Sequence, residues 1–245
     1  MVRQLNHHCR QMKKTIVLLA LWVSVGLLAA APVDTSAFDG SIRVACIGDS
    51  ITAGVGATRD NSYPTQLGRM LGGKWAVMNF GVSGATLLNH GDKPYQKETA
   101  FKRALESHPD VVVIKLGTND TKPKNWKFKD EFLADFKDLI LQFARLPGKP
   151  RIYICRPAFV PGNGNFGINE AGVLEEIPML DEIATAEKVD VIDIHAALKD
   201  HPEMLPDRVH PNNAGATVMA KTVFQALTGK EFTGAAPIFI TETGK

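Results

Sequence analysis

The sequence has 245 residues, of which 44% are hydrophobic and 22% are charged, and its formal net charge is +2. These values are ordinary for a globular protein and exclude a largely disordered chain. The Lys and Arg residues are spread along the chain, so nucleic acid is not expected as a partner. At this length one domain with a single hydrophobic core is expected.

The first 37 residues are expected to form a signal peptide with a short upstream extension. Lys13 and Lys14 precede an apolar run over 16–31, and small residues follow it. A basic segment, an apolar segment and a small-residue cleavage site are typical of an export signal. We place the cleavage after Ala37 or near 30–31, and expect a periplasmic or extracellular protein without stable membrane association. The alternative is an uncleaved anchor, for which the apolar run is short.

Residues 38–232 are expected to form one α/β domain, followed by a loosely ordered tail over 233–245. Runs of mostly continuous apolar residues predict strands over 43–47, 75–80, 110–116, 151–155 and 189–194. Helix-spaced apolar patterns predict helices over 63–71, 97–107, 130–146, 170–187 and 212–227. Strands that are apolar on both faces and alternate with helices indicate a parallel sheet that is covered on both sides.

Two cysteines, Cys46 and Cys155, lie in predicted strands. In an exported protein they could form a disulfide, and two buried thiols are the other interpretation. The sequence contains no zinc-type Cys/His spacing, no His-Glu-x-x-His and no phosphate-binding glycine loop. No metal and no cofactor is therefore expected.

Polar segments follow the first three predicted strands, at the edge where the active sites of parallel sheets lie. These segments are Gly48-Asp49-Ser50, Gly81-Val82-Ser83-Gly84 and Gly117-Thr118-Asn119-Asp120, and Asp207-Arg208-Val209-His210 precedes the last predicted helix. A nucleophilic hydroxyl needs an adjacent base, and the base needs an orienting group. The candidates for these three roles are Ser50, His210 and Asp207.

Acyl transfer also requires hydrogen-bond donors for the oxyanion that forms. The candidates are the backbone N–H of Ser50, the backbone N–H of Gly84 and the side-chain amide of Asn119. Each residue taken alone has a simpler interpretation, because Ser50 could cap a helix, Gly84 could form a turn and His210 could open the last helix. Their joint occurrence favours catalysis. Asp49 and Asp120 are expected to serve as caps or turn residues, and we assign them no chemical step.

Taken in order, the four segments resemble the Ser, Gly, Asn and His blocks of SGNH (GDSL-like) hydrolases, over residues 48–210. The resemblance implies a flavodoxin-like, three-layer α/β/α sandwich with a five-stranded, mostly parallel sheet. It also implies a metal-free serine esterase in which Ser50 attacks, His210 acts as base and then acid, and Asp207 orients His210. Ser50, Gly84 and Asn119 would form the oxyanion hole.

Within this family, residues 61–64, 79–87, 115–120 and 122–126 are most similar to bacterial carbohydrate O-acetylesterases, often described as sialate O-acetylesterase-like. This similarity implies a small-molecule or glycan acyl ester as substrate. A lysophospholipase or short-chain thioesterase of the same family is an alternative, and so is a non-catalytic glycan-binding module. A flavin-binding protein of similar topology is a further one. Because position 52 is Thr, the Gly-x-Ser-x-Gly elbow of α/β-hydrolases is absent.

Candidate substrate contacts are less well defined. Arg156 follows the fourth predicted strand near the expected active edge, and we propose Arg156 and Trp126 as substrate-binding residues. Tyr95, Phe159 and Phe166, like Trp126, lie in predicted loops, where they could line a sugar-binding cleft or cover the core.

Overall fold

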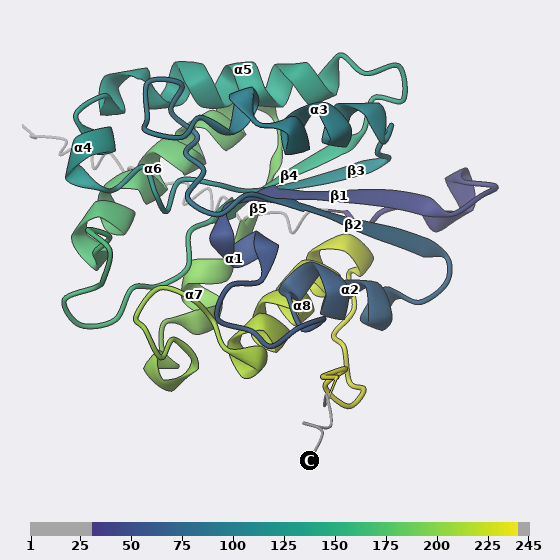
Figure 1. The fold of residues 1–245 in the computed structure, drawn as a ribbon. Coiled ribbons are helices and arrows are strands. Elements are labelled where there is room, and N and C mark those ends of the chain that lie inside the picture. Colours follow the sequence, from purple (N-terminus) through teal and green to yellow (C-terminus); the bar gives the residue numbers. More distant parts are fainter. Residues whose placement is uncertain (1–30, 240–245) are drawn as a thin grey trace, which may run out of the picture.

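The computed structural model describes residues 31–239. At its centre lies a five-stranded sheet with the order β2-β1-β3-β4-β5, and every strand pair is parallel (Figure 1). The strands are β1 (Ile42–Gly48), β2 (Trp75–Gly81), β3 (Val111–Lys115), β4 (Arg151–Arg156) and β5 (Asp190–Asp193). The prediction of a five-stranded parallel sheet is confirmed.

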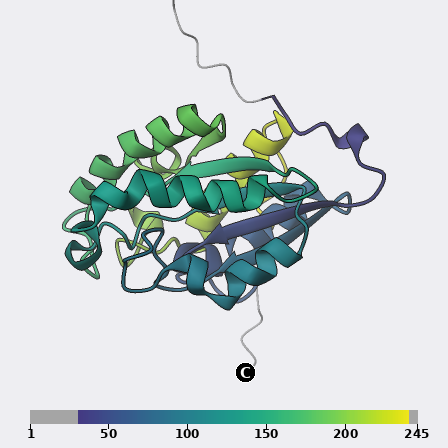
Figure 2. The same ribbon diagram turned by 90° about the horizontal axis from the view of Figure 1, so that it is seen from above.

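Helices cover both faces of this sheet (Figure 1). One face carries α3 (Thr99–Glu106), α5 (Phe132–Ala144) and α6 (Glu170–Glu187). Seen from above, α5 runs between the other two helices (Figure 2). The opposite face carries α1 (Ser50–Ala53), α2 (Tyr63–Leu71), α7 (Ile194–Leu198) and α8 (Asn213–Thr228). The result is the expected α/β/α sandwich.

Strand β3 shows why the apolar runs are mostly continuous rather than alternating. Val112 and Ile114 pack into the core on the α3–α5–α6 side, whereas Val111 and Val113 pack into the core on the α2–α8 side. All five residues of β3 are buried. A central strand of a parallel sheet has no solvent face, so both of its side-chain rows are mostly apolar.

The differences from the predicted elements lie at boundaries and in short helices. The strand predicted over 189–194 ends at Asp193, because the carboxylate of Asp193 accepts the N–H of Ala196 (2.8 Å) and begins α7. Neither α1, α7 nor α4 (Pro123–Trp126) was predicted. Helices of about one turn are too short to show a 3.6-residue periodicity.

Cys46 and Cys155 are buried and unpaired in the same core cluster, so the interpretation as two thiols holds in this structure. Burial raises the pKa of the Cys46 thiol to about 12 and also raises that of Cys155. Neither thiol is therefore activated as a nucleophile at neutral pH.

The two ends of the chain are described in part. The expected signal peptide lies mostly in residues 1–30, outside the described residues. In the part that follows, through residue 239, no helix is long and apolar enough to cross a membrane. Part of the expected tail is attached to the domain, because Asn61 and Phe239 exchange two hydrogen bonds of 2.7 and 2.8 Å.

Candidate active site

The segment after β1 places Ser50 at the start of α1 with its hydroxyl unused by the helix. Asp49 is the N-cap, and its carboxylate accepts the N–H of Ile51 (2.9 Å). The helix packs so closely on the strand end that a Cβ at Gly48 would lie 2.0 Å from the hydroxyl oxygen of Thr52. Because Asp49 is the residue that caps α1, the alternative role of Ser50 as a helix cap is wrong.

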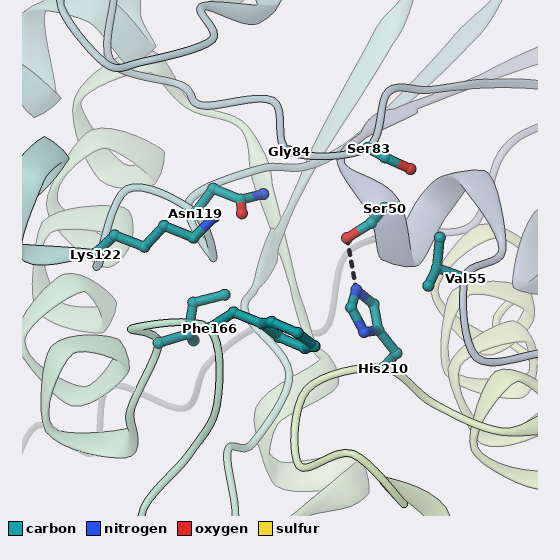
Figure 3. Close-up of a pocket in the computed structure, with 9 residues that line it drawn as sticks. Ser50, Val55, Ser83, Gly84, Asn119, Lys122, Phe166 and His210 are labelled. Carbon is teal, nitrogen blue, oxygen red and sulfur yellow. Dashed lines mark hydrogen bonds between the residues drawn. The ribbon is translucent and has the colours of Figure 1, made fainter.

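Ser50, His210 and Asp207 form a hydrogen-bonded triad. Ser50 Oγ lies 2.9 Å from His210 Nε2 (Figure 3). On the other side of the imidazole, His210 Nδ1 lies 2.7 Å from Asp207 Oδ2. The loop before α8 brings His210 to a serine that is 160 positions earlier in the chain. The geometry fits a serine whose proton is accepted by an imidazole that a carboxylate orients.

Asp207 is itself held by the turn that it shares with His210. Its Oδ1 accepts the backbone N–H groups of Val209 (2.9 Å) and His210 (2.7 Å). Partial burial by itself raises the pKa of Asp207. The hydrogen bonds from the backbone and imidazole of His210 and from the N–H of Val209 outweigh this effect, so the pKa lies below the ordinary value. Asp207 is therefore ionised at neutral pH, as required of a group that stabilises an imidazolium.

Three hydrogen-bond donors face the space beside Ser50. Among residues 31–239, the backbone N–H groups of Ser50 and Gly84 have no hydrogen-bond acceptor. Gly84 has a φ of 82°, a conformation that favours glycine. The Asn119 side chain is 4% exposed, and one of its amide hydrogens is directed to the carbonyl of Ala85 (3.1 Å), which leaves the other free.

These groups line one pocket of about 250 Å³. Its lining residues are Ser50, Val55, Ser83, Gly84, Asn119, Lys122, Phe166, Ile168 and His210 (Figure 3). The structure thus brings together the predicted nucleophile, base and oxyanion donors, with Asp207 behind His210. A carbonyl carbon next to Ser50 Oγ would place its oxygen among these donors, which is the arrangement that acyl transfer requires.

The loop that carries Gly84 is held by Asp120. The buried carboxylate of Asp120 accepts the N–H groups of Leu87 (3.0 Å) and Leu88 (2.8 Å). Burial raises the pKa of Asp120 to about 7, against the effect of these two bonds. Asn119 and Asp120, in the segment after β3, therefore bind the Gly84 loop at two points. Asn119 binds the carbonyl of Ala85, and Asp120 binds the N–H groups of Leu87 and Leu88.

A buried ion pair lies behind the nucleophile. The ammonium group of Lys115 lies 3.1 Å from the Asp49 carboxylate and donates to the Thr118 hydroxyl (2.6 Å), and the side chains of Lys115 and Asp49 are fully buried. The sequence analysis did not identify this pair. A single lysine inside the apolar run over 110–116 was the available signal, because a buried charge requires a partner.

The two proposed substrate-binding residues do not line the pocket. Arg156 is bound to the carboxylates of Asp181 (2.8 Å) and Asp193. Trp126 donates its indole N–H to Glu175 (2.8 Å) and packs edge-on against Phe132. Both side chains therefore have structural partners.

Of the other aromatic residues considered for a sugar cleft, one lines the pocket. Phe166 lies next to His210, whereas Tyr95 is fully buried and Phe159 packs edge-on against His195. The pocket residues that were not predicted as site residues are Val55, Ser83, Lys122 and Ile168. Within residues 31–239, no group of three or more His, Cys, Asp or Glu side chains is placed to hold a metal ion.

A Ser–His–Asp triad at the carboxyl edge of a parallel α/β sheet, beside free N–H groups, defines a serine hydrolase site. The chain belongs to the GDSL-like Lipase/Acylhydrolase family, whose model matches residues 46–218. A relative from Xylanibacter ruminicola, described as an acetylxylan esterase, is 41% identical over 210 residues, which cover 76% of this chain. This match covers only 43% of that relative, so the chain spans less than half of its length.

Solved structures show the same fold. The carbohydrate acetylesterase Est24 from Sinorhizobium meliloti is 20% identical, with a TM-score of 0.61 over 76% of this chain and 97% of that one. A catalytic mutant of Axe2, an acetylxylan esterase from Geobacillus stearothermophilus, is 22% identical, with a TM-score of 0.62 over 80% and 98%. At such identities the likeness is one of fold.

Proposed function

We propose that this chain is a serine esterase that removes O-acetyl groups from carbohydrates through an acyl-enzyme on Ser50. The observation that carries the proposal is the triad, with Ser50 Oγ 2.9 Å from His210 Nε2 and the free N–H groups of Ser50 and Gly84 alongside. The carbohydrate substrate is supported by the relative described as an acetylxylan esterase, at 41% identity.

In the first step His210 Nε2 takes the proton of Ser50 as Oγ attacks the ester carbonyl carbon. The carbonyl oxygen becomes an oxyanion that accepts hydrogen bonds from the N–H groups of Ser50 and Gly84 and from the Asn119 amide. The bond between the carbonyl carbon and the alcohol oxygen then breaks, and His210 protonates the departing alcohol. The products of this step are the free sugar hydroxyl and an acetyl-Ser50 ester.

In the second step water attacks the acetyl-Ser50 carbonyl. His210 takes a proton from this water, and the same donors stabilise the second oxyanion. The bond to Ser50 Oγ breaks and Oγ regains a proton from His210, so acetate is released and the triad is restored. Asp207 stays ionised throughout and stabilises the imidazolium.

The size of the pocket favours a short acyl group. Its volume of about 250 Å³ must hold the acyl group together with the part of the alcohol next to the ester. This is slightly below the usual range of ligand pockets, about 300–1,000 Å³. We therefore expect acetate esters to react faster than long-chain esters, which would separate this function from a lysophospholipase.

The test is hydrolysis of p-nitrophenyl esters from acetate to octanoate, together with acetate release from acetylated xylan. We expect the rate to be greatest for acetate and to be abolished in Ser50→Ala and His210→Ala. Ser107→Ala is the matched control, because Ser107 is the C-cap of α3 and, among residues 31–239, its hydroxyl binds only the carbonyl of Ala104 (2.7 Å). Its turnover should equal that of the unchanged protein.

Labelling with a fluorophosphonate tests the nucleophile without any choice of substrate. We expect one label on Ser50, which Ser50→Ala removes and Ser107→Ala retains. Absence of labelling together with absence of Ser50-dependent ester cleavage would favour the glycan-binding module. A rate optimum at octanoate would favour the lipid-directed alternative.

We further propose that the protein acts after export. The proposal rests on Lys13, Lys14 and the apolar run over 16–31. Val33 donates its N–H to the carbonyl of Leu227 (2.8 Å), a bond that cleavage near 30–31 would keep and cleavage after Ala37 would remove. Expression of the full chain, followed by mass measurement of the processed protein, distinguishes the two sites. Cytoplasmic retention of an unprocessed chain would contradict export.

A further inference from the structure

The loop between β4 and α6 places an exposed aromatic ring against the catalytic histidine. The ring centroids of Phe166 and His210 are 5.7 Å apart, at an interplanar angle of 56°. Phe166 is 56% exposed and lines the pocket beside Ser50 (Figure 3). An exposed ring that forms the wall of a reactive site has a free face on which a ligand can pack.

The chemistry of the triad determines which part of the substrate meets this ring. His210 must protonate the departing alcohol, so the alcohol oxygen lies within hydrogen-bond reach of His210 Nε2. The oxyanion is directed away from this point, toward Gly84 and Asn119. The alcohol portion of the ester, not the carbonyl oxygen, is therefore the part that lies beside Phe166.

The backbone that carries the ring is tied to the catalytic turn by the side chain of Asn165. The Asn165 carbonyl oxygen Oδ1 accepts the N–H of Phe166 (2.9 Å), and Asn165 Nδ2 donates to the backbone carbonyl of Asp207 (3.1 Å). Asn165 and Ile168 also exchange two backbone hydrogen bonds, of 3.0 and 2.8 Å. The backbone of Phe166 is thus tied to the triad, which favours binding because less of the loop has to be ordered when a ligand binds.

The backbone at Phe166 is unfavourable for a bulky residue. Its φ is 55°, in the left-handed region, between Gly164 (φ 65°) and Gly167 (φ 80°). Glycine or asparagine would adopt this conformation more easily. Because Phe166 is 56% exposed, burial of its side chain offsets little of this backbone strain. A strained residue at the edge of a reactive site is a reason to seek a role in ligand binding.

The same pocket also offers polar groups. Neither the ammonium group of Lys122 nor the hydroxyl of Ser83 has a hydrogen-bond or ion-pair partner among residues 31–239. A flat apolar surface in one pocket with a few free polar groups fits a ligand with an apolar face and a polar rim. A pyranose ring has this character, because its C–H groups line its faces and its hydroxyls lie around its edge.

We propose that Phe166 is the platform on which the pyranose ring bearing the ester stacks, so that it determines specificity for sugar esters over simple alkyl esters. This inference rests on the proposed esterase function. It assigns Phe166 to the alcohol side of the substrate and gives it no part in bond making or breaking.

The test compares one sugar ester with one ring-free ester. Phe166→Asn removes the ring and keeps a residue that tolerates the left-handed backbone, and Phe166→Tyr retains an aromatic face. On acetylated xylo-oligosaccharides we expect Phe166→Asn to lower kcat/KM about ten-fold, mainly through KM, and Phe166→Tyr to lower it less than about two-fold. On ethyl acetate, followed by acid release, Phe166→Asn should change kcat/KM by less than about two-fold.

Leu174→Ala is the matched control, since Leu174 is 53% exposed on α6 and does not line the pocket. It should leave both rates unchanged. Equal losses on both esters in Phe166→Asn would show that Phe166 acts through His210 or the fold, and would overturn the inference. Unchanged rates on both esters would also overturn it. If the unchanged protein cleaves neither ester, the esterase function itself fails, an outcome distinct from these two.

Discussion

Lys115 and Asp49 form an ion pair that is fully buried directly behind the nucleophile, with the ammonium group 3.1 Å from the carboxylate. Asp49 uses the same carboxylate to cap α1, the helix that begins with Ser50. The pair therefore connects Lys115, at the end of β3, to the residue that precedes the nucleophile. The start of α1 and the end of β3 both depend on it.

Breaking this pair from one side should destabilise the protein strongly. Lys115→Met leaves the Asp49 carboxylate buried without its cation, so we expect the free energy of unfolding to fall by about 3–5 kcal/mol. Urea denaturation measures this change. The double variant Lys115→Met/Asp49→Asn should recover part of the loss, because no uncompensated charge remains. A single variant within about 1 kcal/mol of the unchanged protein would contradict the importance of the pair.

Asp207→Asn should reduce catalysis while keeping the turn. The Asn carbonyl oxygen can still accept the N–H groups of Val209 and His210, but its NH₂ group would face His210 Nδ1. This favours the tautomer with the proton on Nε2, which cannot accept the proton of Ser50. We expect kcat to fall by about 10²–10⁴-fold. Asp207→Ala, which also loses the turn bonds, should be less stable to urea than Asp207→Asn; equal stabilities would argue against this account.

The lowered pKa of Asp207 has a consequence for acid stability. Its ionised form stabilises the fold above the unfolded-state pKa of about 3.9, and this contribution is lost as the pH falls through the lower folded-state pKa. We expect the difference in unfolding free energy between the unchanged protein and Asp207→Asn to shrink in this acidic window. A difference that is constant from pH 6 down to pH 3 would refute the assignment.

Asn119→Ala tests the oxyanion hole. The variant removes one donor of three, so we expect kcat on p-nitrophenyl acetate to fall by about 10²–10³-fold. The hydrogen bond to the Ala85 carbonyl is lost as well, and circular dichroism must show that the variant is folded. Near-full turnover in a folded Asn119→Ala protein would exclude this role.

Asp120→Asn should change how stability depends on pH. Burial, and to a lesser extent Asp49, raise the pKa of Asp120 to about 7, although the N–H groups of Leu88 and Leu87 oppose this. A raised carboxyl pKa destabilises the fold progressively as the pH rises from about 4 to 7, where only the unfolded chain is ionised. At pH 5 we expect the Asp120→Asn variant to be less stable than the unchanged protein. The amide has one acceptor oxygen, so it accepts the N–H groups of Leu87 and Leu88 less well than the carboxyl group does. By pH 8 the gap should narrow or reverse; a widening gap would disprove the prediction.

Several features of this protein follow from the sequence by itself. The mostly continuous apolar run over 110–116 predicted a strand buried on both faces, and Val112 and Val113 indeed enter opposite cores. The limits of α6 were predicted as observed, and in the structure the side chain of Asn169 caps the start of this helix by accepting the N–H of Gly172 (3.0 Å). The site residues were predictable because each follows a strand, and parallel strands present their carboxyl ends at one edge.

The tertiary structure alone decided which side chains meet. Arg156 lies at the expected edge of the sheet, yet it is bound to Asp181 and Asp193 on α6 and β5, and no local pattern marks those two carboxylates as its partners. Phe166 reaches His210 because the Asn165 side chain bonds to the Asp207 carbonyl, 42 positions away. Periodicity and caps are properties of neighbouring residues, so the sequence predicts them. Pairings across the fold depend on strand order and loop paths, which are set by the packing of the whole chain.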